Sequence, residues 1–206
     1  MTSNTYPGGV TTAARRTPRK GDLREQAILE TARRLLDTKR LAAVTIDELA
    51  AGAGIGRSSF YFYFDSKQAV MTSLLEGLAT ELREENDQWF DGSGPDEDVL
   101  RQALTATVAL WRTHGGLLRQ AFTGDDEQLL AWRAALMERG TRRTAGRIER
   151  DRQAGLIPPG PPSATVLARM LSDLKHDLLI RPEPGQSDEQ LVDDLVWATM
   201  RLLYGG

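Results

Sequence analysis

Residues 45–67 read TIDELAAGAGIGRSSFYFYFDSK, and this stretch decides the fold of the chain. Thr45, followed three residues later by Glu48, matches a capping box and predicts that a short helix begins there. Gly54 stands where the chain must turn sharply with a positive φ, which glycine adopts at little cost. A second short helix is predicted over residues 56–62. Two short helices joined by a tight turn indicate a helix-turn-helix, which places its second helix in a DNA major groove.

The polar side chains of this second helix suit contact with DNA. Arg57, Ser58 and Ser59 fall in its first turn, where side chains reach base edges and free N–H groups meet phosphate. Tyr61 and Tyr63 can present hydroxyls to the DNA backbone. The pattern therefore predicts a DNA-binding head.

A long helix is expected after the helix-turn-helix. Asp65 or Ser66 is predicted to cap it, and it should extend to about Asn86, before the breaking segment Asp-Gly-Ser-Gly-Pro at 91–95. Lys67, just past the cap, supplies a cation for a phosphate.

The remainder of the chain is expected to be helical as well. Apolar residues recur at helical spacing, caps precede them, and glycine and proline clusters separate them, which predicts helices over 96–113, 117–122, 125–153, 163–180 and 187–203. The first of these is expected to stop at the glycine pair 115–116. No segment alternates with period two, so strands are not expected. The prediction is an all-α fold of about nine helices.

The N-terminal residues 1–21 contain prolines and glycines without apolar periodicity, and we expect a disordered arm. Asp22 with Glu25 is predicted to open the first helix of the head. The arm has no acidic residue, and its basic residues are Arg15, Arg16, Arg19 and Lys20.

Charge is distributed unevenly along the chain. Residues 1–70 hold 11 basic and 7 acidic side chains, whereas residues 71–206 hold 15 and 22. A basic head on an acidic body suits a protein that meets a polyanion with one end only. The chain has no cysteine and no apolar run of about 18 residues, so disulfides and a membrane span are not expected, and a cytoplasmic location fits.

The quoted stretch resembles the DNA-binding domain of the TetR family of bacterial repressors, since FYFYF followed by DSKQAV is similar to the junction of that family's third and fourth helices. Within the family, residues 21–70 most resemble the EthR-type branch. The resemblance implies a basic arm at 1–21, a DNA-binding domain at 22–70 and an effector-binding and dimerisation domain at 71–206. By the same resemblance, the DNA-facing residues are Thr45, Arg57, Ser58, Ser59, Tyr61, Tyr63 and Lys67.

The resemblance also implies partners. A homodimer built from the last two long helices would bind a double-stranded operator, and a small-molecule effector in the body would release it. Leucines at helical spacing on both helices agree with such an interface, although the same stripes could be ordinary core within one chain. Gly56 departs from the family pattern, in which a serine or threonine is common, and this removes one polar contact.

The expected effector pocket lies in the body. All four tryptophans of the chain are there, and tryptophan and methionine line adaptable apolar pockets, although they fill cores equally well. The candidate ligand-binding residues are Trp89, Trp111, Phe122, Trp132, Met170, Asp173 and Trp197. The helix expected over 125–153 is rich in arginine, which leaves the ligand either hydrophobic or amphipathic and charged. Alternatively these arginines pair with neighbouring acids on a solvated face; they are Arg139, Arg142, Arg143 and Arg147.

The sequence contains none of the residue patterns that would indicate an enzyme active site. The two histidines, His114 and His176, match no metal-binding spacing, and the chain contains no nucleophile elbow, Walker loop or dinucleotide-binding glycine motif. We therefore expect no catalytic group, metal or cofactor. Two functions stay open: a transcriptional regulator released by a ligand, and a constitutive DNA-binding or architectural factor of the same fold.

Overall fold

The computed structural model describes residues 20–205, and within them every regular element is helical. The elements are α1 (Lys20–Thr38), the 3-10 turn η1 (Leu41–Ala43), α2 (Ile46–Gly52), α3 (Arg57–Phe60), α4 (Lys67–Asp91), α5 (Glu97–Thr123), α6 (Glu127–Gln153), α7 (Ala164–Ile180) and α8 (Asp188–Tyr204). The all-α prediction is confirmed. The expected arm lies outside the described residues except for its last two, which already belong to α1.

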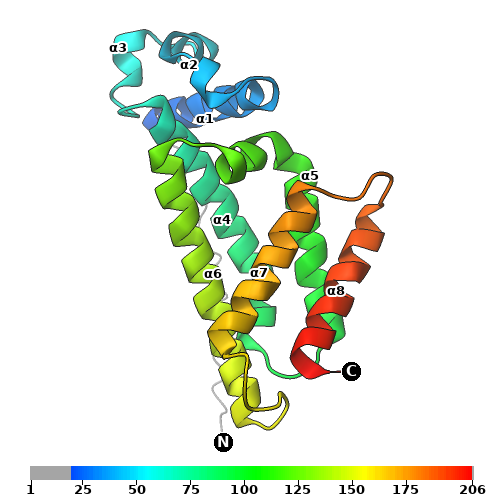
Figure 1. Cartoon of the computed structure of the whole chain (residues 1–206). Helices are drawn as coiled ribbons and strands as arrows, with labels where there is room; N and C mark the ends of the chain where they lie inside the picture. Colours follow the sequence, from blue (N-terminus) through cyan, green and yellow to red (C-terminus); the bar gives the residue numbers. More distant parts are fainter. Residues whose placement is uncertain (1–19, 206) are drawn as a thin grey trace, which may run out of the picture.

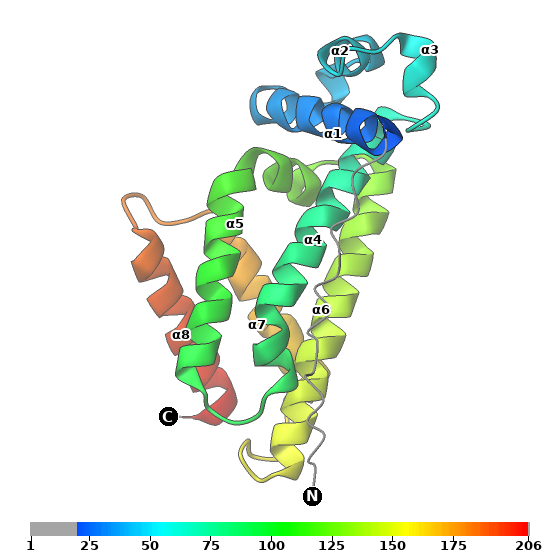
Figure 2. The same ribbon diagram turned by 180° about the vertical axis from the view of Figure 1, so that it is seen from behind.

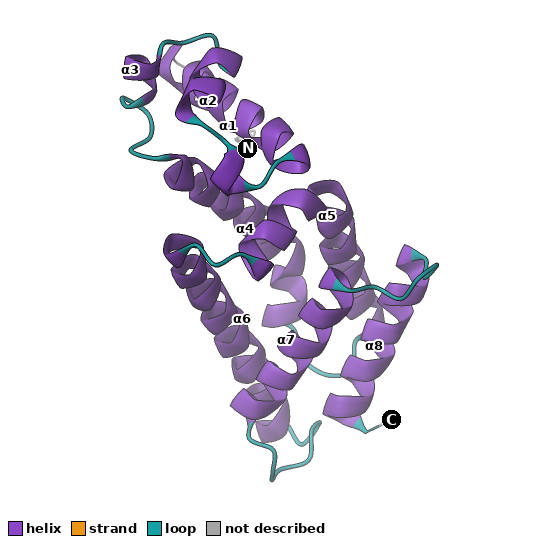
Figure 3. Ribbon diagram, turned by 45° about the horizontal axis from the view of Figure 1, so that its top comes forward, coloured by secondary structure: helices purple, strands orange, loops and turns teal. Residues whose placement is uncertain are grey.

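The molecule has a small head and a long body that share one helix (Figures 1 and 2). α1, α2 and α3 form the head, and α4 runs from the head down into the body, where it packs against α5 and α6, while α7 packs on α6 and α8 on α5. The head has its own buried centre, in which Ile28, Leu49 and Phe60 are almost completely enclosed. α7 and α8 lie side by side on one face of the body (Figures 1 and 3).

Local capping interactions explain where the helices begin. The capping boxes of Thr45 with Glu48 and of Ser187 with Gln190 are both present. Ser66 caps α4, as one of the two predicted alternatives, and Ser163 caps α7. The predicted cap of α6 is wrong by one residue, because Asp126 rather than Asp125 accepts the N–H groups of the first turn.

The predicted helix break near the glycine pair 115–116 is present, but it lies at the residue just before the pair. α5 consists of two helical segments that meet at a kink at His114, whose φ and ψ are −118° and 22°. Gly116 lies against the end of α1, where an added Cβ would sit 3.2 Å from the Leu36 carbonyl oxygen. A close approach between helices therefore explains this glycine. α4 also runs on to Asp91, five residues beyond the predicted end.

A buried polar network closes the end of the body opposite the head. Arg147 and Asp151 on α6 form an ion pair (Nε–Oδ2, 3.6 Å), and their side chains are 1% and 0% exposed. The Arg147 guanidinium lies 3.5 Å from the centre of the Trp89 ring and donates to the Gly94 carbonyl. Asp151 accepts from the Gly94 N–H at 3.1 Å and from the Tyr204 hydroxyl at 2.7 Å. The network joins the end of α4, α6 and the end of α8.

Three other arginines of α6, all in the predicted set, pair with acids at the surface. Arg139 lies 3.8 Å from Glu76, Arg142 lies 2.9 Å from Glu138, and Arg143 lies 2.8 Å from Asp87. The predicted solvated, acid-paired face is present for these three. Arg147 differs, because it is buried.

Candidate functional site

Hydrogen bonds hold both the start of α2 and the turn between α2 and α3. The Thr45 hydroxyl accepts the Glu48 N–H at 3.2 Å, and the Glu48 carboxylate accepts the Thr45 N–H at 3.0 Å. The Lys39 ammonium, 2.5 Å from Glu48, holds the pKa of that carboxyl at about 2, so it stays ionised. Gly54 has a φ of +66°, and its carbonyl accepts from Arg24 on α1 at 2.9 Å. Because the Thr45 hydroxyl is engaged in the cap, this residue places α2 rather than offering a free donor.

α3 turns its apolar residue inward and its polar residues outward. Phe60 is fully buried against the head core, whereas Arg57 and Ser58 are exposed and Ser59 is half-buried. The Arg57 guanidinium is 2.7 Å from Asp47 on α2, in an ion pair that is open to solvent. A polyanion can therefore compete for this arginine at small cost. The predicted DNA-facing residues of α3 share one exposed face.

The aromatic run after α3 alternates between core and solvent. Phe64 is buried and Tyr63 packs against the head core, while Tyr61 is 46% exposed. Phe62, which the sequence analysis did not select, is 87% exposed beside Tyr61. An aromatic residue so fully open at the end of α3 is a candidate for apolar contact with a base. The sequence signal was weak, because a phenylalanine among aromatics is more often a core residue.

Lys67 has a different role from the free phosphate cation that was predicted. Its ammonium donates to the carbonyl oxygens of Ala42 at 2.9 Å and Val44 at 2.8 Å, which ties the start of α4 to the segment before α2. Two of its three N–H donors are thus engaged within the head. The charge still lies at the N-terminus of α4, where it adds to the positive end of the helix dipole.

Two of the predicted pocket residues come together in the body. The rings of Trp111 and Phe122, both on α5, lie 5.3 Å apart, and the ring of His176 on α7 stacks on Phe122 at 5.0 Å. A pocket of about 360 Å³ adjoins this row, with Trp111, Arg112 and Arg119 of α5 among its lining residues. Asp37 at the end of α1 borders the same pocket, which places it where the head meets the body.

Two further tryptophans are enclosed by polar partners. Trp89 is covered by Arg147 in the buried network, and the Trp132 N–H donates to Glu76 on α4 at 2.8 Å. Both act as packing residues of α4 and α6 in this structure.

The remaining three predicted pocket residues lie on the outer surface, which corrects the sequence analysis. Trp197 on α8 is 65% exposed and Met170 on α7 is 45% exposed, and Asp173 is exposed too. The reason is rotational: helical spacing groups residues on a face but does not say which face meets the rest of the chain.

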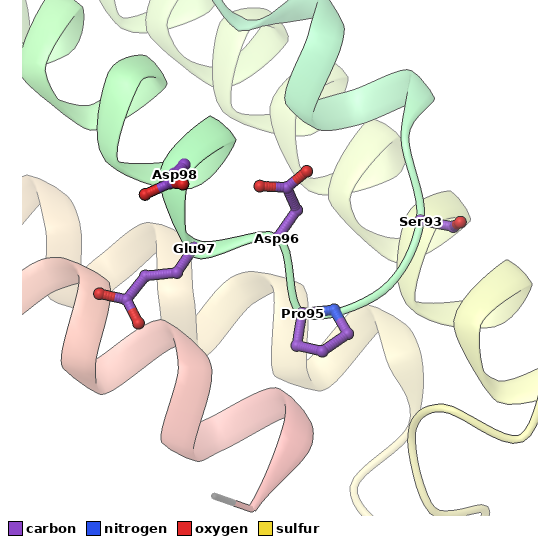
Figure 4. A pocket seen from close by; sticks show the side chains of 5 residues that line it. All are labelled: Ser93, Pro95, Asp96, Glu97 and Asp98. Carbon is purple, nitrogen blue, oxygen red and sulfur yellow. The ribbon is translucent and has the colours of Figure 1, made fainter.

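A second hollow is acidic and lies far from the head. A crevice of about 650 Å³ is lined by Ser93, Pro95, Asp96, Glu97 and Asp98, which Figure 4 shows along the loop entering α5. Asp96 accepts the Val99 N–H as the cap of α5. Helix capping accounts for this cluster, so we assign it no ligand.

One side chain connects head and body directly. The Gln120 amide on α5 donates to the carbonyl oxygens of Leu36 at 2.9 Å and Lys39 at 3.0 Å, and its oxygen accepts the Leu41 N–H at 2.7 Å. These three bonds span the end of α1 and the start of η1. Sequence analysis missed Gln120, because its partners are about 80 residues away.

Comparisons with known proteins agree with the geometry. Residues 28–74 match the family described as bacterial regulatory proteins, tetR family. The chain is 34% identical over 211 residues to the HTH-type transcriptional regulator EthR of Mycolicibacterium smegmatis, covering 95% of this chain and 97% of that protein. It is 32% identical to EthR of Mycobacterium tuberculosis strain H37Rv, covering 93% and 92%.

Solved structures share the fold. NalD of Pseudomonas aeruginosa, a secondary repressor of the MexAB-OprM efflux pump, aligns with a TM-score of 0.72 at 18% identity, covering 90% of this chain and 98% of that one. AibR in complex with isovaleryl coenzyme A and operator DNA aligns with a TM-score of 0.64 at 20% identity, covering 88% and 98%. Every helix in the described part of the chain is too short or too polar to span a bilayer.

Proposed function

Because the chain belongs to the tetR family of bacterial regulatory proteins and its relatives are transcriptional regulators, we propose that it is a homodimeric repressor released from its operator by a small-molecule effector. The observation that carries the proposal is the exposed face of α3. Arg57 and Ser58 are exposed on α3, Tyr61 and Phe62 are exposed directly after it, and Phe60 anchors the helix in the core of the head.

The chemistry of this face matches a major groove. The Arg57 guanidinium suits the paired acceptors of a guanine, and the Ser58 hydroxyl can donate or accept at a base edge or phosphate. The Phe62 ring can contact a thymine methyl group, and the Tyr61 hydroxyl can reach the backbone. The third N–H of Lys67 and the free N–H groups at the start of α4 would bind a phosphate at the groove edge.

A homodimer would explain the exposed apolar face of α7 and α8. Val166 and Met170 on α7 and Trp197 and Leu202 on α8 are all exposed, and the two helices lie side by side. A second copy can cover the same patch through two-fold symmetry. The dimer would present two α3 helices to half-sites about 34 Å apart, one turn of DNA.

The head–body contacts supply a route from effector to DNA. α4 belongs to both parts, and Gln120 fixes the end of α1 to α5 beside the pocket bordered by Trp111 and Asp37. An effector that favours a different bend of α5 would move the head and change the spacing of the two α3 helices. By linkage, DNA and effector then weaken each other by the same factor. The second candidate, a constitutive DNA-binding factor, would show no such reciprocity.

The DNA assignment is tested by substitution on α3. Arg57→Ala and Phe62→Ala should each weaken operator binding by about 1–3 kcal/mol, roughly 5- to 150-fold, because each removes a base contact. The operator is first selected from random duplexes by the wild-type protein, and affinity is then measured by fluorescence anisotropy at one salt concentration.

The matched control is Arg142→Ala, which removes the same charge from an exposed position on α6. It should leave operator affinity nearly unchanged. If both α3 variants bind the operator with wild-type affinity, α3 is not part of the DNA interface.

The coupling route is tested at Gln120. Gln120→Leu keeps the size of the side chain and removes its three hydrogen bonds to the head. Backbone amides around residues 36–41 should then exchange with solvent roughly 5- to 150-fold faster. This corresponds to a loss of about 1–3 kcal/mol in the free energy of local opening. Hydrogen exchange read by mass spectrometry measures this, with the exposed Gln128→Leu on α6 as control. Unchanged exchange rates around residues 36–41 would show that the Gln120 hydrogen bonds do not hold the end of α1 against α5.

A further inference from the structure

The inward face of α7 carries one charged side chain. Ala168, Leu171, Leu178 and Leu179 mark this face, since two are buried and two pack against the core. Lys175 follows Leu171 by four residues and precedes Leu179 by four, so it lies on the same stripe. Within residues 20–205, the structure gives Lys175 no ion pair and no hydrogen bond. Charged residues on a core-facing stripe normally have a partner.

The Lys175 side chain is partly removed from water, but it is not fully enclosed by other residues. Its burial in the body lowers the pKa of its ammonium group. At the same time, the residue keeps part of its surface accessible, unlike the enclosed Ala168 and Leu179 on either side. The ammonium is therefore within reach of a solute at this face of α7, and an anion there would supply the missing counter-charge.

The neighbouring histidine does not compete as a cation. His176 Nδ1 lies 2.6 Å from the Ser172 carbonyl oxygen, so Nδ1 carries the proton and donates it. Burial, followed by the charge of Lys175, lowers the pKa of His176 to about 3, and the ring stays neutral. The neutral ring stacks on Phe122, which in turn contacts Trp111. Lys175 is therefore the charged residue of α7 next to this uncharged aromatic row, while Arg112 and Arg119 of α5 line the adjoining pocket.

The same region touches the pocket at the junction of head and body. Trp111, at one end of the aromatic row, lines the pocket of about 360 Å³, and so does Leu179, one turn after Lys175. A ligand along the row would therefore lie next to the kinked part of α5 that carries Gln120.

We infer that the effector is a monocarboxylic acid whose carboxylate pairs with Lys175 and whose apolar part lies along Phe122 and Trp111. The inference rests on the proposed function, because it names the chemical class of the proposed effector. A carboxylate restores the ammonium form of Lys175 and accepts its hydrogen bonds, whereas an alcohol of the same shape brings no charge. The body should therefore discriminate sharply between an acid and the matched alcohol.

Two matched pairs of probes test the preference directly. 4-Phenylbutanoate is compared with 4-phenylbutan-1-ol, and decanoate with decan-1-ol, by titration calorimetry on the full chain without DNA. We expect each acid to bind at least about tenfold more tightly than its alcohol, the scale of a charged hydrogen bond. Lys175→Met should abolish the preference while keeping the apolar contacts, and the surface control Arg142→Met should preserve it.

A second measurement remains valid if the Lys175→Met variant does not fold. The chain contains four lysines, so ¹³C-methylated lysine signals are readily assigned. The Lys175 signal should titrate with a lower pKa than the signals of the other three lysines. Adding the acid should raise the pKa of Lys175, and adding the alcohol should not. Equal affinity for acid and alcohol, an acid preference that survives Lys175→Met, or no binding by any of the four probes would each overturn the inference.

Operator binding is measured separately so that the two proposals can fail independently. If acids and alcohols release DNA equally well, the proposed ligand-released repressor stands, and the proposal that Lys175 selects carboxylates is wrong. If the acids bind more tightly in a way that depends on Lys175 but do not change operator affinity, the Lys175 site stands and the proposed release mechanism is wrong.

Discussion

Replacing Asp151 with alanine is expected to lower the free energy of unfolding by about 3–5 kcal/mol, the cost of leaving a buried charge without its partner. Arg147 is 1% exposed and pairs with Asp151, and the Gly94 N–H and Tyr204 hydroxyl also donate to that carboxylate. Burial and the Asp151 carboxylate raise the pKa of Tyr204 to about 12, so its hydroxyl stays protonated as a donor. One substitution therefore leaves the buried Arg147 charge without its counter-ion and the Gly94 N–H without an acceptor, while the Tyr204 hydroxyl keeps the Gly94 carbonyl oxygen as an acceptor at 2.9 Å.

Urea denaturation followed by far-UV circular dichroism measures this loss. The matched control is Glu138→Ala, which breaks the exposed pair with Arg142 and should cost less than about 1 kcal/mol. The double variant Arg147→Met with Asp151→Leu should recover most of the stability, because apolar groups of similar volume need no partner. If Asp151→Ala unfolds like the surface control, the network does not hold the body together.

Replacing Trp197 with glutamate is expected to convert the dimer into monomers. Trp197 is 65% exposed, so the substitution leaves the core of each chain intact. At a two-fold interface it occurs twice, and it removes an aromatic contact of the kind that contributes about 2 kcal/mol or more to association. The dimer dissociation constant should therefore rise by roughly 30-fold or more. Operator affinity should fall as well, because a monomer presents one α3 to one half-site.

Sedimentation equilibrium gives the dissociation constant directly. Leu130→Glu on α6 is the matched control, since Leu130 is also an exposed large apolar residue but is on neither α7 nor α8. It should leave the dimer unchanged. A Trp197→Glu protein that dimerises with wild-type affinity would place the interface elsewhere on the molecule.

The local features of the head were predictable from residues 45–67 alone. The cap at Thr45, the turn at Gly54 with positive φ and the cap at Ser66 are all present. Each depends on hydrogen bonds or backbone conformations that reach across three or four residues, so a short segment is sufficient to specify it. The exposed polar face of α3 follows from the same short-range pattern, because Phe60 must turn inward.

Features that depend on distant segments were not predictable in the same way. The helix break predicted near the glycine pair 115–116 is present as a kink at His114, but the two glycines are themselves helical. A glycine costs a helix about 1 kcal/mol, which the close packing of Gly116 on the end of α1 can offset. Lys67 likewise reads as a free cation, but two carbonyl oxygens more than 20 residues upstream engage it.

The sequence by itself determined the helices, the caps at Thr45, Ser163 and Ser187, and the polar first turn of α3, because these rest on interactions between near neighbours in the chain. Only the tertiary structure decided that Trp89 is enclosed and Trp197 is exposed, although both stand at helical spacing among apolar residues. Only the tertiary structure placed Lys175 on the core-facing side of α7, next to His176 of the aromatic row. The physical reason is that helical periodicity defines a face, whereas burial depends on which distant helix packs against that face.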